Sequence, residues 1–227
     1  MTTLGSAVTD AAHAIEDAVK PRLRGVLHEA AFAISLVTGT VIVTLADSGL
    51  ERVASAVYAG SVALLFGTSA AYHRGTWSTR SHALMARLDH SMIFVLIAGT
   101  YTPFCLLLLD GWLRWTLLSV VWGVAVLGIL LRNVLRQPPR WVFVAIYLAM
   151  GWAGLLVMPQ VLDSGGVAVL VLMGTGGLFY TAGAVVYARQ RPDPSPRWFG
   201  FHEVFHACTL AAFAVHYIAV SLAVYGS

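Results

Sequence analysis

Long apolar stretches separated by short polar links make up most of this chain of 227 residues. A helix that crosses the hydrocarbon core of a bilayer needs ~20 mostly apolar residues. Seven stretches meet this requirement, namely 26–46, 53–72, 83–109, 112–131, 141–162, 165–188 and 201–225. The pattern therefore predicts an all-α integral membrane protein built as a seven-transmembrane-helix bundle. Residues 1–24 are expected to form an N-terminal segment, and residues 25–227 the transmembrane domain.

The composition supports this interpretation over the alternative of an unusually apolar soluble helical domain. Charged residues make up only 11% of the chain, hydrophobic residues make up 58%, and the mean hydropathy is +0.76. Soluble domains carry about 25% charged residues, because a water-facing surface is built from them. So few charges could not cover a soluble domain, and we place the chain in the cell membrane as a multi-pass protein.

The distribution of basic residues predicts the orientation of the bundle. Lys and Arg near span ends remain on the cytoplasmic side. Of the 14 basic residues only Arg52 and Arg114 fall on one side of the predicted membrane. All the others flank links on the opposite side, so we expect a cytoplasmic N-terminus and an extracytoplasmic C-terminus. The basic residues form no single patch, which argues against a nucleic-acid partner and leaves membrane lipids as the expected surroundings.

Ionisable residues inside a membrane are costly, and their presence is by default a sign of function. Several of them lie near span ends in this chain, and the predicted topology places them all at the cytoplasmic end. Members of this group are His73, Asp89, His90, His202, Glu203 and His206. A random distribution would have divided them between the two sides.

Their spacing adds a chemical interpretation. His202 and His206 are four residues apart, so they project from one helix face and can share a metal ion. A third imidazole from His73 would complete a three-histidine zinc site and leave a fourth position for water. Asp89 could hydrogen-bond that water or orient a histidine. Ser69 has the same four-residue spacing from His73, and we expect it to act beside Asp89 in catalysis.

The remaining histidines have simpler interpretations. We expect His13, His28 and His82 to be ordinary interfacial groups, because each lies near an expected helix end or interface. His90 should point about 100° away from its neighbour Asp89 around the helix and miss the site. His216 lies deeper in the last span, where we expect a hydrogen-bonding group of the core.

Residues 202–206 also match a competing pattern, since they read His-Glu-Val-Phe-His. Two histidines that enclose a glutamate general base are typical of zinc proteases. Such enzymes need a third ligand, and beyond His206 the chain offers only His216 and no acid. A membrane zinc protease is therefore the less favoured interpretation, with Glu203 either assisting at the site or facing the cytoplasm.

Taken together, these segments resemble the hemolysin III family, which is related to the progestin and adipoQ receptors and more distantly to the alkaline ceramidases. The similar stretches are Pro21-Arg22-Leu23-Arg24-Gly25 with His28, Ser69-Ala-Ala-Tyr-His73, Leu88-Asp89-His90, Ala98-Gly99-Thr100-Tyr101-Thr102-Pro103-Phe104, His202-Glu-Val-Phe-His206 and Val215-His216-Tyr217. The resemblance implies seven helices with the N-terminus inside and a zinc ion held by His73, His202 and His206. It also implies that Asp89 lies near the zinc-bound water and that Ser69 is the serine of the family site.

Three functions are compatible with this sequence. The leading hypothesis is a zinc-dependent hydrolase that cleaves a membrane lipid amide or ester, with ceramide-like lipids as the nearest analogy. The second is a non-enzymatic membrane receptor or regulator in which zinc is structural and the ligand is lipid-like. The third is a pore-forming hemolysin, although a pore needs a continuous polar pathway and the outer halves of the spans carry few polar residues.

Overall fold

The structure is a computed structural model that describes residues 20–135 and 140–226. Helices account for nearly all of these residues. In chain order they are α2 (Val26–Thr44), α3 (Gly49–Arg74), α4 (Thr79–Leu108), α5 (Gly111–Val134), α6 (Arg140–Gly151), the 3-10 helix η1 (Trp152–Val157), α7 (Met158–Arg189) and α8 (Phe201–Tyr225). The expected N-terminal segment 1–24 lies outside the described residues, apart from its last five.

Within the described ranges, six helical stretches are long and apolar enough to cross a membrane. This confirms the prediction of an all-α, multi-pass membrane protein. Five of the stretches are α2, α3, α4, α5 and α8. The sixth is a run of 49 residues, Trp141–Arg189, that includes α6, η1 and α7.

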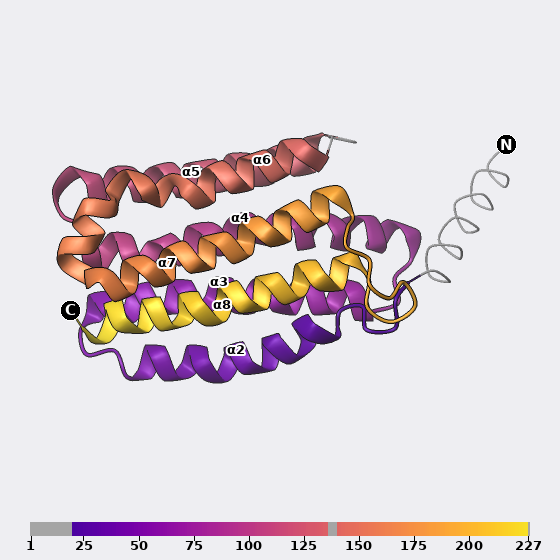
Figure 1. The fold of residues 1–227 in the computed structure, drawn as a ribbon, viewed down its shortest axis with the longest axis horizontal. Helices are drawn as coiled ribbons and strands as arrows, with labels where there is room; N and C mark the ends of the chain where they lie inside the picture. The colour runs from indigo at the N-terminus through magenta and orange to yellow at the C-terminus, as the bar shows by residue number, and fades with distance from the viewer. Residues whose placement is uncertain (1–19, 136–139, 227) are drawn as a thin grey trace, which may run out of the picture.

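The internal break of this long run lies beside the one expected. The sequence pattern predicted a link at residues 163–164, because Asp163 and Ser164 are polar. The 3-10 helix η1 joins α6 to the first turns of α7, with Pro159 in the first turn of α7, where a proline is tolerated. The two helices of this run are separated by a kink at Gly166, whose backbone is not helical and which lies two residues beyond the predicted link. Figure 1 shows this run turning back once, at the end of the bundle where the C-terminus lies.

The helices form one bundle whose two ends differ in character. The most extensive contacts join α7 to α8, α3 to α4, and α2 to α3. The beginning of α2, the α3–α4 link and the α7–α8 link all lie at one end of the bundle, opposite the C-terminus (Figure 1). The basic residues of these segments are therefore at a common end, which we call the basic end.

Helix boundaries place the ionisable residues at this basic end. α3 starts with a capping box in which the Ser48 hydroxyl accepts from the Glu51 N–H at 3.2 Å and the Glu51 carboxylate accepts from the Ser48 N–H at 2.9 Å. From there the helix runs the width of the bundle, so His73 falls in its last turn. α8 starts at Phe201, which places His202 in its first turn.

Close packing of α3 against α4 leads to a first testable prediction. A Cβ atom at Gly99 would collide with the side chain of Ser61, which is buried and donates to the Tyr58 carbonyl at 2.7 Å. We expect Gly99→Ala to lower the free energy of unfolding by ~1–3 kcal/mol, the usual effect of overpacking. Thermal unfolding of the detergent-purified protein measures this change.

Gly123→Ala is the matched control, because it lies in the middle of α5 with no atom within 4 Å of an added Cβ. This variant should be neutral or more stable, since alanine favours a helix over glycine by ~1 kcal/mol. Equal stability of the two variants would mean that the α3–α4 contact tolerates the extra methyl group.

Candidate metal centre

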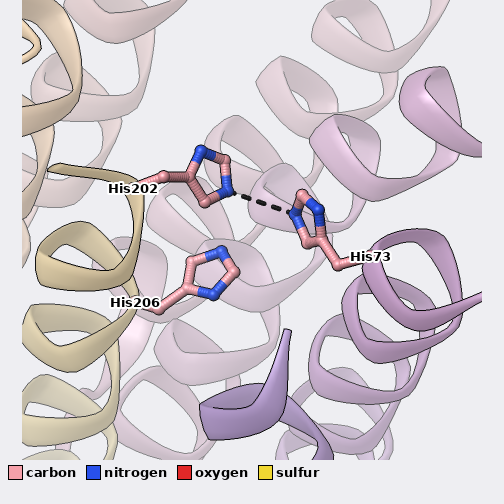
Figure 2. Close-up of side chains that lie close together, drawn as sticks. All are labelled: His73, His202 and His206. Carbon is pink, nitrogen blue, oxygen red and sulfur yellow. Dashed lines mark hydrogen bonds between the residues drawn. The ribbon is translucent and has the colours of Figure 1, made fainter. Parts of the chain in front are cut away.

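Three histidines from two helices converge at the basic end of the bundle. His73 comes from the last turn of α3, and His202 and His206 come from the first turns of α8. One ring nitrogen from each lies within 4.8 Å of the corresponding nitrogens of the other two. Figure 2 shows His73 reaching across to the two histidines of α8. The structure thus brings together the three residues that the spacing had singled out.

The distances between the rings suit a single small cation. The Nε2 atoms of His73 and His202 are 3.1 Å apart (Figure 2). Two nitrogens that bind a tetrahedral zinc at ~2.0–2.1 Å lie roughly 3.3 Å from each other. His206 is almost fully buried, and its Nδ1 has no hydrogen-bond partner among the described residues. The donor set could therefore hold a metal ion, with imidazole nitrogens of the kind that zinc prefers.

His28 packs against this cluster, contrary to the prediction of an ordinary interfacial group. Only 3% of its surface is exposed, and its ring stacks on that of His206 with centroids 3.6 Å apart. Its Nδ1 lies 2.8 Å from the Oγ of Ser69. His28 therefore supports one candidate ligand and fixes the serine hydroxyl, since a stacked and hydrogen-bonded ring restricts both neighbours.

Asp89 approaches the cluster from α4. Its Oδ2 is 3.9 Å from Nε2 of His73, beyond direct hydrogen-bonding distance, and 3.8 Å from Nδ1 of His90. Ser69 also interacts with this carboxylate. Asp89 thus lies beside the three histidines without joining them, and Ser69 lies between His28 and Asp89.

Glu203 does not face the metal cluster. Its side chain is 1% exposed, and one carboxylate oxygen accepts a hydrogen bond from the Arg24 guanidinium. The other oxygen accepts from the Gly200 N–H at 2.8 Å and caps the start of α8. With both oxygens engaged, Glu203 is not placed to act as the general base of a zinc protease, so the geometry disfavours that interpretation.

A short N-terminal segment covers the cluster from the basic end. The N–H groups of Arg22 and Leu23 donate to the carbonyls of Arg197 and Trp198 at 3.0 and 3.1 Å. Gly25 follows with φ +83°, and a Cβ atom there would lie 2.7 Å from the Cβ of His73. Only glycine fits this position, because the backbone is left-handed and touches a candidate ligand.

The other histidines lie where the sequence predicted or outside the described residues. His90 contacts the Ala86 carbonyl at 2.7 Å and the Tyr187 hydroxyl at 3.1 Å, and it is not part of the three-histidine cluster. His216 is buried, with its Nε2 3.2 Å from the Met173 carbonyl. His82 is partly exposed, and His13 lies outside the described residues.

A large cavity extends from the cluster into the bundle. Its volume is about 1760 Å³, which exceeds the ~300–1,000 Å³ of ordinary ligand pockets. Ser69, His73, Asp89, His202 and His206 line one part of it. Farther from the cluster the walls are mainly apolar, as shown by Ile93, Leu96, Ile97, Phe104, Leu170 and Met173. A ligand that fills this space must combine a polar group with a long apolar portion.

Comparison with known families agrees with these features. The family described as Haemolysin-III related matches residues 17–217, which include every residue of the cluster. The chain belongs to this family. The resemblance inferred from short segments of the sequence is thus confirmed over most of the chain.

Individual relatives of this Haemolysin-III related chain come from bacteria, animals and plants. The "Hemolysin-3 homolog" of Bacillus subtilis is 30% identical over 173 residues, covering 76% of this chain and 78% of the relative. "Hemolysin-3" of Bacillus cereus is 30% identical over 168 residues, covering 74% of each protein. "Heptahelical transmembrane protein 4" of Arabidopsis thaliana is 27% identical over 188 residues, covering 70% of this chain and 45% of the relative.

Proposed function

We propose that this Haemolysin-III related protein is a zinc-dependent hydrolase that cleaves an amide or ester bond of a membrane lipid. The observation that carries the proposal is a buried three-histidine cluster at one end of a large, mostly apolar cavity. A polar head placed at the cluster and a hydrocarbon tail placed in the cavity would match both parts of this space.

His73, His202 and His206 would hold the metal, which leaves a tetrahedral ion one position open for chemistry. A zinc ion bound there would activate water and polarise the scissile carbonyl. His28 would keep the ring of His206 in place through the stacked contact. His73 and His206 are buried, and burial strengthens the electrostatic interactions of these groups.

Asp89 and Ser69 would handle the proton and the developing charge. As water adds to the carbonyl carbon, its proton passes to a carboxylate oxygen of Asp89. When the carbon–nitrogen or carbon–oxygen bond breaks, Asp89 returns this proton to the departing amine or alcohol. Ser69, held by His28 at 2.8 Å, would donate a hydrogen bond to the oxyanion. The products are a carboxylic acid and an amine or alcohol.

We further infer that the chain crosses the membrane seven times, with a cytoplasmic N-terminus and an extracytoplasmic C-terminus. A straight helix of the 49 residues from Trp141 to Arg189 would be roughly 70 Å long, more than twice the hydrocarbon thickness of ~30 Å. The kink at Gly166 and the turn of this run in Figure 1 support two crossings. The basic residues at one end of the bundle support the orientation, and the plant relative is named heptahelical.

The decisive experiment combines metal analysis with a substrate screen. Elemental analysis of protein purified without metal-affinity resins should find about one zinc ion per chain. The same preparation should release fatty acid from a lipid amide or ester in a screen that includes ceramides, and a chelator should stop the reaction. Bound zinc without hydrolysis of any lipid would favour the receptor in which the metal is structural.

Asp89→Asn separates the proton-transfer role from metal binding. We expect this variant to keep its metal, because Asp89 lies outside the three-histidine cluster, and to hydrolyse lipid about 10²–10⁴-fold more slowly. Asp163→Asn, an exposed substitution in α7, is the control and should behave as the wild type. If the Asp89→Asn variant hydrolysed lipid at the wild-type rate, the carboxylate of Asp89 would have no part in the mechanism.

A further inference from the structure

Basic side chains dominate the charged lining of the cavity. Among the residues the structure describes, five basic side chains border it, against the single carboxylate of Asp89. Arg24 is paired with Glu203, and Arg74 donates to Glu29 at 3.1 Å. The charges of the other three, Lys20, Arg87 and Arg132, are not neutralised by an ion pair within the described ranges.

Arg132 stands out among these three. A basic residue in the last turn of a membrane helix ordinarily extends toward water and lipid headgroups. Arg132 instead lies over the ring of Phe143, 5.2 Å from its centroid, and borders the cavity. Its Nε is buried and has no hydrogen-bond partner among the described residues. A buried guanidinium N–H without an acceptor is unfavourable, so an acceptor is expected from whatever fills the cavity.

Lys20 approaches the site from a different segment. It borders the cavity, and it is close enough for its charge to act on His73, as the charge of Arg132 acts on Asp89. Two cations from separate segments therefore reach the histidine end of a cavity that is mainly apolar elsewhere. Such a charge distribution raises the local concentration of anions over neutral molecules.

We propose that the cavity selects a lipid whose headgroup carries a phosphate, with the phosphate contacted by Arg132 and Lys20. A guanidinium presents a planar fork that matches phosphate oxygens, and the ammonium of lysine adds a point charge. The hydrocarbon chains occupy the apolar part of the cavity. This inference rests on the proposed function for the assignment of the cavity to a lipid, and it names the class of that lipid.

A binding experiment tests the headgroup without requiring hydrolysis. The full-length protein in a neutral detergent is titrated with dioleoyl phosphatidic acid or dioleoylglycerol, and bound lipid is counted by native mass spectrometry. The two lipids carry the same chains and differ in the phosphate. We expect the wild type to bind the phosphatidic acid at least about tenfold more tightly, as one or two charge-assisted hydrogen bonds provide.

Arg132→Gln should reduce this preference about tenfold and leave dioleoylglycerol binding unchanged, while Arg132→Lys should retain part of it. Arg189→Gln is the matched control, since Arg189 is exposed at the basic end and does not border the cavity. Melting temperatures of all variants show whether they remain folded. An equal loss in Arg189→Gln would mean that surface charge alone attracts the lipid, which would overturn the proposal.

Two further arms identify the source of the anion. Oleate that binds as tightly as phosphatidic acid would overturn the choice of phosphate in favour of a carboxylate. Inorganic phosphate that displaces the lipid at equal concentration would overturn the choice of a lipid. If the wild type prefers phosphatidic acid but hydrolyses no lipid, the proposed hydrolase fails while the phosphate site stands. Equal binding of the two dioleoyl lipids would overturn the proposed phosphate site and would not contradict the proposed hydrolase.

Discussion

Replacement of His206 by alanine is expected to abolish lipid hydrolysis and to weaken metal binding by more than about 10²-fold. Loss of a group that merely supports a ligand already costs 10- to 100-fold in metal affinity, and among the described residues His206 supplies one of the three imidazole nitrogens that converge. Metal content after dialysis against a weak chelator and the initial rate of fatty-acid release measure the two effects.

The same variant distinguishes the three candidate functions. A hydrolase loses activity and remains folded, a protein with structural zinc loses its fold, and a pore keeps its conductance. His206 is also buried against His28, so alanine leaves a space in the packing. Chelation of the wild-type protein removes the metal without changing this packing, and it should reproduce the loss of activity. His82→Ala, a partly exposed histidine at the same end, is the control and should retain metal.

Arg24→Ala is expected to destabilise the protein by ~3–5 kcal/mol, because it leaves the carboxylate of Glu203 buried without its partner. Reversible unfolding in mixed micelles measures the change. Arg74→Ala provides the comparison within the same chain, since the Arg74–Glu29 pair has side chains 50% and 60% exposed. Exposed pairs contribute ~0–1 kcal/mol.

A second substitution separates the unpaired charge from lost packing. The double variant Arg24→Ala/Glu203→Gln should recover much of the stability, because no buried charge then lacks a partner. Glu203→Gln alone should retain most of the hydrolysis, since the carboxylate faces Arg24 and the start of α8. A Glu203→Gln variant that is folded, binds metal and is inactive would favour the zinc-protease interpretation. An Arg24→Ala variant as stable as Arg74→Ala would show that the buried pair contributes little.

The membrane architecture and the histidine cluster could be predicted because each leaves a local signal. Length and apolar composition identify spans, and a spacing of four residues identifies one helix face. The prediction that His73 meets His202 needed a further step. The distribution of basic residues placed the ends of both helices on the same side of the membrane. Whether the cluster binds zinc remains a prediction.

Contacts between distant segments left no comparable signal. Arg24 and Glu203 are 179 residues apart, so the sequence did not show that they pair. His28 was assigned from its position alone, which says nothing about stacking on His206 in another helix. A usable signal was the position of His28 in an N-terminal stretch that resembles the start of hemolysin III family sequences. By contrast, the polar residues Asp163 and Ser164 marked the link expected at residues 163–164 locally, and the kink between the two helices lies beside it at Gly166.

The N-terminal segment that pairs with the α7–α8 link also constrains the order of assembly. Ribosomal synthesis delivers this segment and His73 well before His202, His206 and the carbonyls of Arg197 and Trp198. Until α8 inserts, the nascent chain holds one of the three clustered imidazoles and cannot form the cluster. Formation of the cluster therefore waits for α8, and a product that stops before α8 reaches the bilayer without it.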